Sequence, residues 1–365
     1  MEIQAAVCRD KGSFRLEAVD LSEPQQDEIL VRIVASGMCH TDLAVRDQHL
    51  PLPLPAVLGH EGAGIVERVG QGVSKFRQGD HVVLSYGSCG KCGNCLGGRP
   101  AYCAEFLAYN VGTRRPDGSC THQQHGQPLT GCFFYQSSFA TYALTHVRNA
   151  VKVADDLPLE VLAPLGCGIQ TGAGAVFNCL RPRAGSSIAI FGAGAVGLSA
   201  VMAAAAAGCA TIVVVDVLES RLALAQELGA TVVVNGRSGD AVAAVRKASG
   251  GGTDYAVEAT GIPAVMAQSF DALNGTGTSI VLGVAPAGAA VSVDASSLLG
   301  GKMIRGAIEG ESIPEIFIPQ LIALWKAGKF PFDRLARYYN FDQINEAAHD
   351  SERGVAIKPI LRMPA

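Results

Sequence analysis

The sequence predicts an α/β protein of two domains, in which an irregular β-rich domain comes first and a doubly wound parallel sheet follows. Three observations support this prediction. The 365 residues are more than one ordinary hydrophobic core accommodates, and 48% of them are hydrophobic. The first third is rich in turns and carries short β-type runs at residues 29–35, 64–69 and 81–84. From about residue 167 onward, strand and helix patterns alternate.

The second region begins with the apolar run 187–191, a Gly-rich turn and an Ala-rich helix. Its strands are continuously apolar, which indicates a parallel sheet with helices on both faces. After about residue 307 the pattern becomes mixed, and we expect the chain to return to the first domain. The expected domains are therefore 1–168 with 307–365, and 169–306. The remaining elements expected here are strands at 211–216, 231–234, 254–258 and 278–283, and helices at 220–228 and 240–249.

Composition excludes several classes of protein. The net charge of −4 gives no electrostatic reason to expect nucleic acid or an anionic membrane as a partner. The N-terminus lacks the apolar core of a signal peptide, and the most apolar helical stretch, 196–207, is too short to span a bilayer. Eleven cysteines without a secretory signal indicate a cytoplasmic protein with reduced thiols, used for metal binding or packing.

Gly192, Gly194 and Gly197 form the pattern G-x-G-x-x-G between a strand and a helix, as in a Rossmann dinucleotide-binding domain. The glycines permit a tight turn, close approach of the pyrophosphate and close helix–strand packing. Asp216 ends the next strand, where a carboxylate binds ribose hydroxyls and repels the 2′-phosphate of NADP. Asp216 as a mere helix cap is the alternative, and Arg221 could still meet a phosphate. NAD is the predicted cofactor.

Four cysteines lie close together in a Gly-rich segment with the spacing C-x2-C-x2-C-x7-C. Thiolates on successive turns suit a closed tetrahedral zinc site, which would be structural because no position remains for substrate. An iron–sulfur cluster uses similar spacing, but no proline follows the last cysteine as in bacterial ferredoxins. The predicted ligands are Cys89, Cys92, Cys95 and Cys103.

A second set of candidate metal ligands is dispersed over the chain: Cys39, His60 and Cys167. Two cysteines, one histidine and an open position are typical of catalytic zinc. Spacing alone does not unite these residues, because they are far apart and other cysteines exist. The zinc-protease pattern HExxH is absent, since Gly64 stands where the second histidine would be.

The segment around His60 matches the signature G-H-E-x2-G-x5-G-x2-V at every fixed position. With this signature, the four-cysteine lobe and the glycine pattern in order, the chain resembles zinc-dependent medium-chain alcohol dehydrogenases over essentially its whole length. Segments 37–42, 52–60 and 164–174 resemble those of bacterial aryl-alcohol (benzyl-alcohol) dehydrogenases. The resemblance implies a GroES-like catalytic domain beside the Rossmann domain, and NAD- and zinc-dependent oxidation of alcohols to aldehydes.

The resemblance makes Cys39, His60 and Cys167 the ligands of a catalytic zinc, which lowers the pKa of the alcohol as a Lewis acid. Glu61 would lie behind the metal and approach it during exchange of water for alcohol. Asp42 would orient the imidazole of His60. Thr41 would hydrogen-bond the alcohol and start a proton relay, although an ordinary turn or cap is its alternative role.

Further residues are assigned to the cofactor by the same resemblance. Lys358 matches a basic residue near the pyrophosphate. The relay departs from the liver-type enzymes, because Ala44 stands where their histidine passes the proton to solvent. His40 is our candidate for both the base and a pyrophosphate contact, with His49 as a substitute. Positions expected to line the nicotinamide, with core packing as the alternative for the apolar ones, are Thr171, Val196, Leu282 and Val284.

Tyr86 corresponds to a position on the substrate pocket wall in the family, and an aromatic slot would hold a benzyl-type ring. This implies aromatic or allylic primary alcohols as substrates. Cinnamyl, aliphatic or glutathione-adduct alcohols are alternatives, as is a non-catalytic nucleotide-binding protein of the same fold. We expect a homo-oligomer, a tetramer in preference to a dimer, with 279–285 near the sheet edge as the contact. Phenylalanines that could add aromatic surface are Phe106, Phe133, Phe134 and Phe139.

Overall fold

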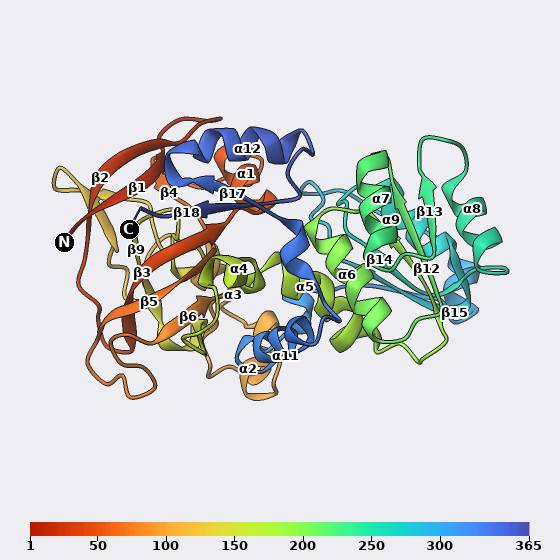
Figure 1. Cartoon of the computed structure of the whole chain (residues 1–365), viewed down its shortest axis with the longest axis horizontal. Helices are drawn as coiled ribbons and strands as arrows, with labels where there is room; N and C mark the ends of the chain where they lie inside the picture. The colour runs from red at the N-terminus through yellow and green to blue at the C-terminus, as the bar shows by residue number, and fades with distance from the viewer. Residues whose placement is uncertain (365) are drawn as a thin grey trace. The chain divides into compact units, whose positions relative to one another are not determined.

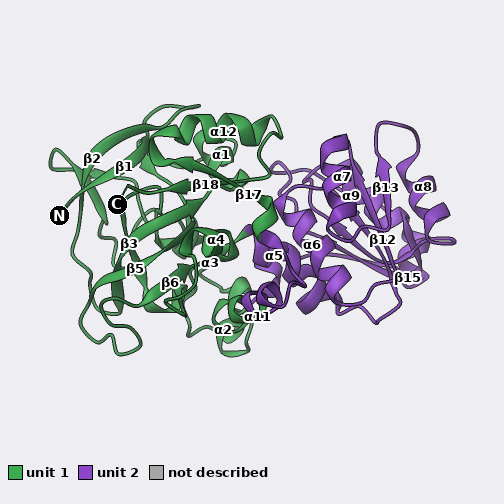
Figure 2. Ribbon diagram, viewed as in Figure 1, with its two compact units in different colours: residues 1–167, 313–320, 333–365 green, residues 168–312, 321–332 purple. Residues whose placement is uncertain are grey.

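The computed structural model describes residues 1–364, which form two compact units (Figure 1, Figure 2). Unit 1 contains residues 1–167, 313–320 and the chain from 333 onward, and unit 2 contains 168–312 and 321–332. The first part of unit 1 thus ends at residue 167, one residue before the expected boundary at 168. The chain returns to unit 1 at residue 313, later than the expected 307. The return at residue 313 directly precedes helix α11 (Pro314–Lys326), and a further division between residues 320 and 321 falls within this helix.

Unit 1 is built on two sheets whose strands come from distant parts of the chain. Nearly all pairs are antiparallel, and only β17 and β18 pair in parallel among the described strands of this unit. The smaller sheet has the order β4 (Ala56–Val57), β1 (Glu2–Cys8), β2 (Arg15–Leu21), β7 (His122–Gln124), β8 (Gln127–Leu129). The larger has the order β10 (Ala150–Val153), β6 (His81–Leu84), β5 (Glu61–Val69), β3 (Glu28–Gly37), β18 (Lys358–Arg362), β17 (Ala336–Asn340), and β9 (Tyr142–His146) also pairs with β3.

Strand β3 shows why this unit folds as a sheet. Its alternate side chains Ile29, Val31 and Ile33 are buried on one face, where they pack against Val66 of β5 and Val82 of β6. This period of two is the expected pattern of a strand. The short helices of unit 1 are α1 (His40–Arg46), α2 (Gly93–Leu96), α3 (Phe106–Val111), α4 (Leu159–Leu162) and α12 (Ile344–Glu352).

Unit 2 is a parallel sheet with helices, as the sequence predicts. Apolar strand residues such as Phe191 and Val213 pack against Val245 and Phe270 of two helices. The strand order is β13 (Val232–Asn235), β12 (Thr211–Asp216), β11 (Ser187–Phe191), β14 (Thr253–Glu258), β15 (Leu273–Val281), β16 (Met303–Gly306). Its helices include α5 (Gly168–Gly174), α6 (Ala195–Ala206), α7 (Glu219–Glu227), α8 (Ala241–Ala248), α9 (Pro263–Asp271) and α10 (Ala295–Leu299).

The strand order locates the ligand crevice of unit 2. It reverses direction between β11 and β14, and doubly wound sheets bind ligands at such a point, outside the carboxyl ends of the strands. Residues 279–285 run from the end of β15 into the following turn. Strand β15 pairs with β14 on one side and with the outer strand β16 on the other, so these residues lie one strand from the sheet edge. Their role as an oligomer contact stays a prediction.

Within residues 1–364, no helix combines the length and the apolar character needed to cross a bilayer.

Candidate zinc and dinucleotide sites

The dispersed zinc candidates meet in unit 1 because of the register of β3. Gly37, the last residue of β3, pairs with Glu61, the first residue of β5, and with Ile360 of β18, so the three strands lie side by side (Figure 1). Cys39 follows the end of β3, and His60 precedes the first residue of β5. Cys167 follows a 3-10 turn at 163–166, whose Gly166 carbonyl accepts a 2.7 Å hydrogen bond from Ser85 Oγ.

The donor set fits a zinc ion. One ligand atom from each of Cys39, His60, Glu61 and Cys167 lies within 4.8 Å of the others. His60 is fully buried, and its Nε2 has no hydrogen-bond partner among residues 1–364. A buried imidazole nitrogen without a partner is costly, and two thiolates with one imidazole are a familiar zinc set. The residues therefore fit the metal that the sequence predicts.

Asp42 contacts the imidazole of the predicted zinc ligand His60. Its Oδ1 lies 2.9 Å from Nδ1 of His60, which leaves Nε2 directed to the metal position. Oδ1 also accepts from the Gly59 backbone N–H at 3.1 Å, and Oδ2 accepts from the Cys39 N–H at 2.9 Å. Asp42 thus fixes both ligand segments at once. Burial lowers the pKa of His60, but the charge of Asp42 outweighs it, and the pKa lies well above its ordinary value.

Gln136 provides a second support that sequence reasoning missed. Its Nε2 donates to the carbonyl of His60 at 3.0 Å, and its Oε1 accepts from the Gly62 N–H at 3.0 Å. The side chain is 1% exposed. No local signal marks Gln136, because its partners lie more than seventy residues away in the chain.

Lys358 forms a buried ion pair with Glu61 that the sequence did not predict. It is 2% exposed, and its Nζ lies 2.9 Å from both carboxylate oxygens of Glu61 and 3.2 Å from the Met38 carbonyl. Burial lowers the pKa of Lys358, but the Glu61 carboxylate raises it above the ordinary range. Lys358 therefore neutralises Glu61 behind the thiols. The contact of Lys358 with the pyrophosphate that the resemblance implies stays a prediction.

The relay candidates lie on helix α1. Thr41 is half-buried, with Oγ1 3.7 Å from Cys39 Sγ, so its hydroxyl is next to the metal ligands. His40 is exposed at the first position of α1, and Ala44 is buried in the same helix. His49 is exposed beyond the helix end. The structure thus places Thr41 and not His49 beside the zinc set.

Aromatic side chains enclose the imidazole of His60. The ring of Phe134 stacks on it with centroids 4.4 Å apart, and Phe133 meets it edge-on at 5.5 Å. Tyr86 is buried and packs against Phe106 at 5.8 Å within the same cluster. Phe139 is fully buried against Phe14 instead. Phe133 and Phe134 thus contact the candidate zinc ligand, whereas Phe139 contacts another ring of the same hydrophobic cluster.

The four-cysteine lobe forms a second compact donor set. Its four sulfur atoms lie within 4.8 Å of one another. Backbone N–H groups point at the sulfurs: Cys103 Sγ accepts from the Cys89 N–H at 3.2 Å, and Cys92 Sγ accepts from Ala104 at 3.4 Å. The hydrogen bond from Ala104 contributes most to lowering the pKa of Cys92 to about 6. A set of four thiolates in turns fits a structural zinc.

The glycine turn of unit 2 has the expected dinucleotide-binding geometry. Gly192 has φ of +95°, and a Cβ on Gly197 would lie 1.8 Å from the Gly192 carbonyl oxygen, so only glycine fits there. A Cβ on Gly194 would meet no atom within 4 Å. Open space therefore lies in front of the N-terminus of α6, where free N–H groups favour a phosphate.

Asp216 connects this turn to the end of β12. Its Oδ2 accepts from the Ala193 N–H at 2.6 Å, and its Oδ1 accepts from the N–H groups of Val217 and Leu218 at 2.7 and 2.9 Å. It thus holds the glycine turn as well as the turn that follows the strand. Arg221 is half-buried, and its Nε has no hydrogen-bond partner in the described part of the chain.

The remaining cofactor candidates lie in unit 2 with different exposure. Thr171 and Val196 are half-buried. Leu282 is half-buried, and its N–H donates to the Glu258 carbonyl at 2.8 Å. Val284 is 70% exposed. These positions follow the carboxyl ends of strands or lie on α5 and α6.

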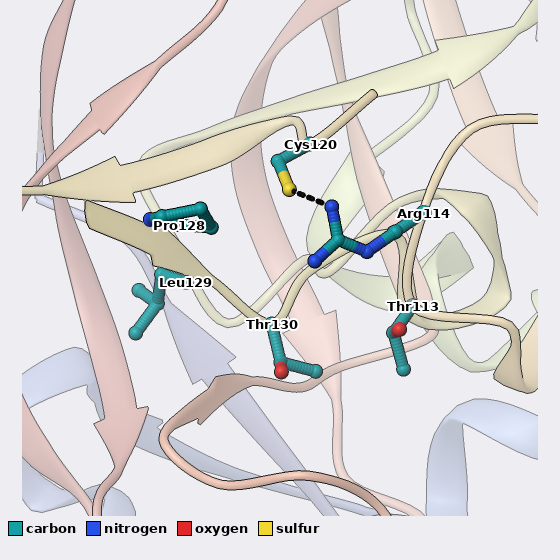
Figure 3. Close-up of a pocket in the computed structure, with 6 residues that line it drawn as sticks. All are labelled: Thr113, Arg114, Cys120, Pro128, Leu129 and Thr130. Carbon is teal, nitrogen blue, oxygen red and sulfur yellow. Dashed lines mark hydrogen bonds between the residues drawn. The ribbon is translucent and has the colours of Figure 1, made fainter. Parts of the chain in front are cut away.

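A separate small pocket in unit 1 takes no part in these sites. It lies by the β7–β8 hairpin, where the Arg114 guanidinium is 2.8 Å from the Cys120 thiol (Figure 3). None of the predicted site residues lines it. Its lining residues are Thr113, Arg114, Cys120, Pro128, Leu129 and Thr130.

Comparison with known proteins agrees with this chemistry. Residues 25–155 match the alcohol dehydrogenase GroES-like domain, and residues 195–326 match the zinc-binding dehydrogenase family. The geraniol dehydrogenase of Castellaniella defragrans is 48% identical over 362 residues, which cover 98% of this chain and 97% of that protein. The chain belongs to the zinc-dependent medium-chain alcohol dehydrogenases.

Two further proteins are similar to this dehydrogenase over essentially their whole length. The crystal structure of benzyl alcohol dehydrogenase from Acinetobacter calcoaceticus superimposes with a TM-score of 0.96 at 50% identity, covering all of both chains. The S-(hydroxymethyl)glutathione dehydrogenase of Komagataella pastoris is 33% identical over 375 aligned positions, covering 100% of this chain and 98% of that protein. The family, the two zinc sites and a nicotinamide dinucleotide cofactor are therefore established for this chain, and the alcohol is the open question.

Proposed function

We propose that this dehydrogenase uses NAD to oxidise primary alcohols whose reacting carbon adjoins an aromatic ring or a double bond. The observation that carries the proposal is the aromatic enclosure of the zinc ligand His60 by Phe133 and Phe134, with Tyr86 and Phe106 in the same cluster. Aromatic walls favour flat, polarisable groups over polyols or small aliphatic alcohols. Relatives named for geraniol and for benzyl alcohol support the same substrate class.

In this proposal Cys39, His60 and Cys167 hold the catalytic zinc. When bound, zinc supplies a Lewis acid that lowers the pKa of the alcohol hydroxyl. Asp42 keeps the imidazole in place, and the Thr41 hydroxyl would take up the hydroxyl proton of the substrate while passing its own proton toward His40. With that proton removed, the reacting carbon would give its hydride to the bound dinucleotide and become the aldehyde carbon, while the aromatic rings keep water away from it. Glu61, neutralised by Lys358, lies behind the thiols, able to approach the metal during ligand exchange.

We assign proton release to His40. It is the neighbour of Thr41 in the chain and is exposed, whereas Ala44 is buried and carries no titratable group. Replacing His40 with Ala should flatten the acidic limb of the kcat/KM pH profile, because the base that accepts the proton is gone. His49→Ala is the matched control and should leave the profile as in the parent. An unchanged profile for His40→Ala would exclude this role.

We assign binding of the cofactor's ribose to Asp216 and Arg221. The pyrophosphate would bind to the glycine turn formed by Gly192, Gly194 and Gly197, with His40 as a further pyrophosphate contact. The anionic Asp216 disfavours a 2′-phosphate, so NAD is preferred over NADP. The nicotinamide would lie against Thr171, Val196, Leu282 and Val284.

A substrate panel tests the proposed function. Benzyl alcohol and geraniol should give kcat/KM values at least about tenfold above those of cyclohexylmethanol and ethanol with NAD. Cyclohexylmethanol is the matched control, because it keeps the ring size and lacks the π system. Higher specificity for ethanol, a polyol or S-(hydroxymethyl)glutathione would refute the substrate class, and a preference for NADP would refute the cofactor assignment.

We also propose that the dehydrogenase assembles through unit 2, as a tetramer in preference to a dimer. Strand β16 is the outer strand of its sheet, and Leu298, Leu299 and Met303 beside it are 43%, 92% and 55% exposed. Exposed apolar groups next to an open strand edge are typical of an interface. Light scattering should show association that Leu299→Glu weakens, whereas a monomer at micromolar concentration would refute it. The eleven free thiols also support a reducing, cytoplasmic location.

A further inference from the structure

The turn that follows β16 has strained backbone at a functional edge. Glu309 and Glu311 have positive φ angles of 50° and 51°, and Gly310 between them has φ of 60°. Residues other than glycine rarely adopt this backbone conformation, and such strained residues tend to occur where a protein holds a ligand. The turn leaves the carboxyl end of β16, the edge at which doubly wound sheets bind ligands.

The strain holds the Glu309 carboxylate against helix α5. Glu309 is 7% exposed, and its Oε2 lies 3.4 Å from Thr171 Oγ1 and 3.3 Å from Gln170 Nε2. Gln170 is fully buried, and its Oε1 accepts from Ser312 Oγ at 3.1 Å. Hydroxyl and amide groups therefore donate to one buried carboxylate oxygen.

Close packing fixes this arrangement. A Cβ on Gly310 would lie 2.7 Å from the carbonyl oxygens of Gln170 and Thr171, so the turn contacts the helix backbone directly. The Gly310 carbonyl also accepts from Asn178 Nδ2 at 3.0 Å. The turn is thus packed directly on α5, with Glu309 beside Thr171.

Glu258, another buried carboxylate at this edge, has different hydrogen-bond partners. It ends β14, and its Oε1 accepts from the backbone N–H groups of Thr260 and Gly261 at 2.6 and 3.1 Å. Glu258 therefore shapes its own turn. Glu309 instead directs its charge to side chains of α5, one of which is the proposed nicotinamide contact Thr171.

We propose that Glu309 is a positioning residue of the nicotinamide half of the site, which holds the Thr171 hydroxyl and favours the cationic oxidised ring over the neutral reduced ring. This inference rests on the proposed binding of NAD in unit 2. The oxidised ring carries a positive charge that the reduced ring lacks, so a fixed anion nearby stabilises only the oxidised form. Glu309 thereby tunes the balance between alcohol oxidation and aldehyde reduction.

The size of the effect follows from Coulomb's law. One charge removed at ~10 Å, with an effective dielectric constant of about 20 to 40, changes relative affinity roughly four- to sixteenfold. Glu309→Gln should therefore raise the Kd for NAD⁺ by about that factor while the Kd for NADH stays within about twofold. Glutamine keeps an oxygen that accepts from Thr171, so this variant isolates the charge. Glu309→Ala removes the acceptor as well and should weaken NADH binding too.

The measurements are calorimetric titrations with NAD⁺ and ADP-ribose and fluorescence titrations with NADH, on the full-length zinc-loaded protein. Glu311→Gln is the matched control: it removes the same charge from the same turn, but Glu311 pairs with Arg305. The control should keep the parent ratio of the two Kd values. ADP-ribose lacks the ring, so its Kd should be the same in every variant.

Two outcomes separate this inference from the proposed function. If the parent protein binds NAD⁺ and ADP-ribose but Glu309→Gln leaves the NAD⁺ to NADH ratio within twofold, Glu309 has no such role. If the parent binds neither ligand, or binds only NADP, the cofactor assignment itself fails.

Discussion

The two cysteine-containing donor sets of unit 1 differ in which residues supply their ligand atoms. The lobe takes four sulfur donors from residues 89–103, and backbone N–H groups surround them. The other site combines two sulfurs and one imidazole from three distant segments, with a carboxylate network behind them. The lobe offers four thiols, the closed donor set that is typical of structural zinc sites. The second set offers two thiols and one imidazole, the donor set of catalytic zinc sites, which keep a position open for substrate.

The largest test of this difference is Cys39→Ser. It should reduce zinc from two ions to one per chain and lower kcat/KM by on the order of a thousandfold, because the Lewis acid is lost. Elemental analysis and steady-state kinetics measure both, and the melting temperature should change little. A variant that kept near-parent activity with one zinc would place catalysis elsewhere.

Cys103→Ser should show the opposite pattern. Loss of the lobe zinc should lower the melting temperature by on the order of 10 °C, because metal binding contributes several kcal/mol to folding. The kcat/KM per folded chain should stay close to that of the parent. Cys120→Ser, a thiol outside both sets, is the matched control and should keep two zincs. If Cys103→Ser abolished turnover of the folded fraction, the lobe would not be purely structural.

Asp42→Asn should give an intermediate effect. The amide keeps the shape but weakens the hold on His60, and loss of such a partner costs about 10- to 100-fold in metal affinity or activity. Zinc competition with a chelator and kcat/KM report the effect. Asp47→Asn, a partly exposed carboxylate beside the same helix, should change neither. Parent-like zinc affinity in Asp42→Asn would mean that Gln136 and the aromatic rings alone position the imidazole.

Substitutions in the aromatic pairs of the two sites should have the smallest effects on substrate preference and stability. Phe134→Leu should reduce the preference for benzyl alcohol over ethanol by about fivefold, since an aromatic contact is worth about 1 kcal/mol. Tyr109→Leu removes a ring that stacks on Tyr135 in the lobe and should alter stability alone. An equal shift of substrate preference in both variants would mean that the rings act through general stability.

Local patterns could be predicted from the sequence, and long-range register could not. The four-cysteine lobe and the turn from Gly192 to Asp216 are each encoded within one short segment. Uniting Cys39, His60 and Cys167 required the family signature, because the pairing of β3 with β5 has no local mark. The same limit explains why the ion pair of Lys358 with Glu61 and the contacts of Gln136 and Glu309 were not predicted. Their roles depend on which distant side chain they meet.

The pairing of β18 with β3 has a consequence for synthesis of the protein. The ion-pair partner of Glu61 is Lys358, the first residue of β18, which lies 297 residues later in the sequence. A growing chain can form the lobe and pair β3 with β5 early. The Glu61 carboxylate, however, lacks the Lys358 ammonium group until all of unit 2 has been translated. The metal centre is thus among the last parts of the enzyme to mature, and a ribosome-bound chain that stops before β18 should load the lobe zinc but hold the catalytic zinc only weakly.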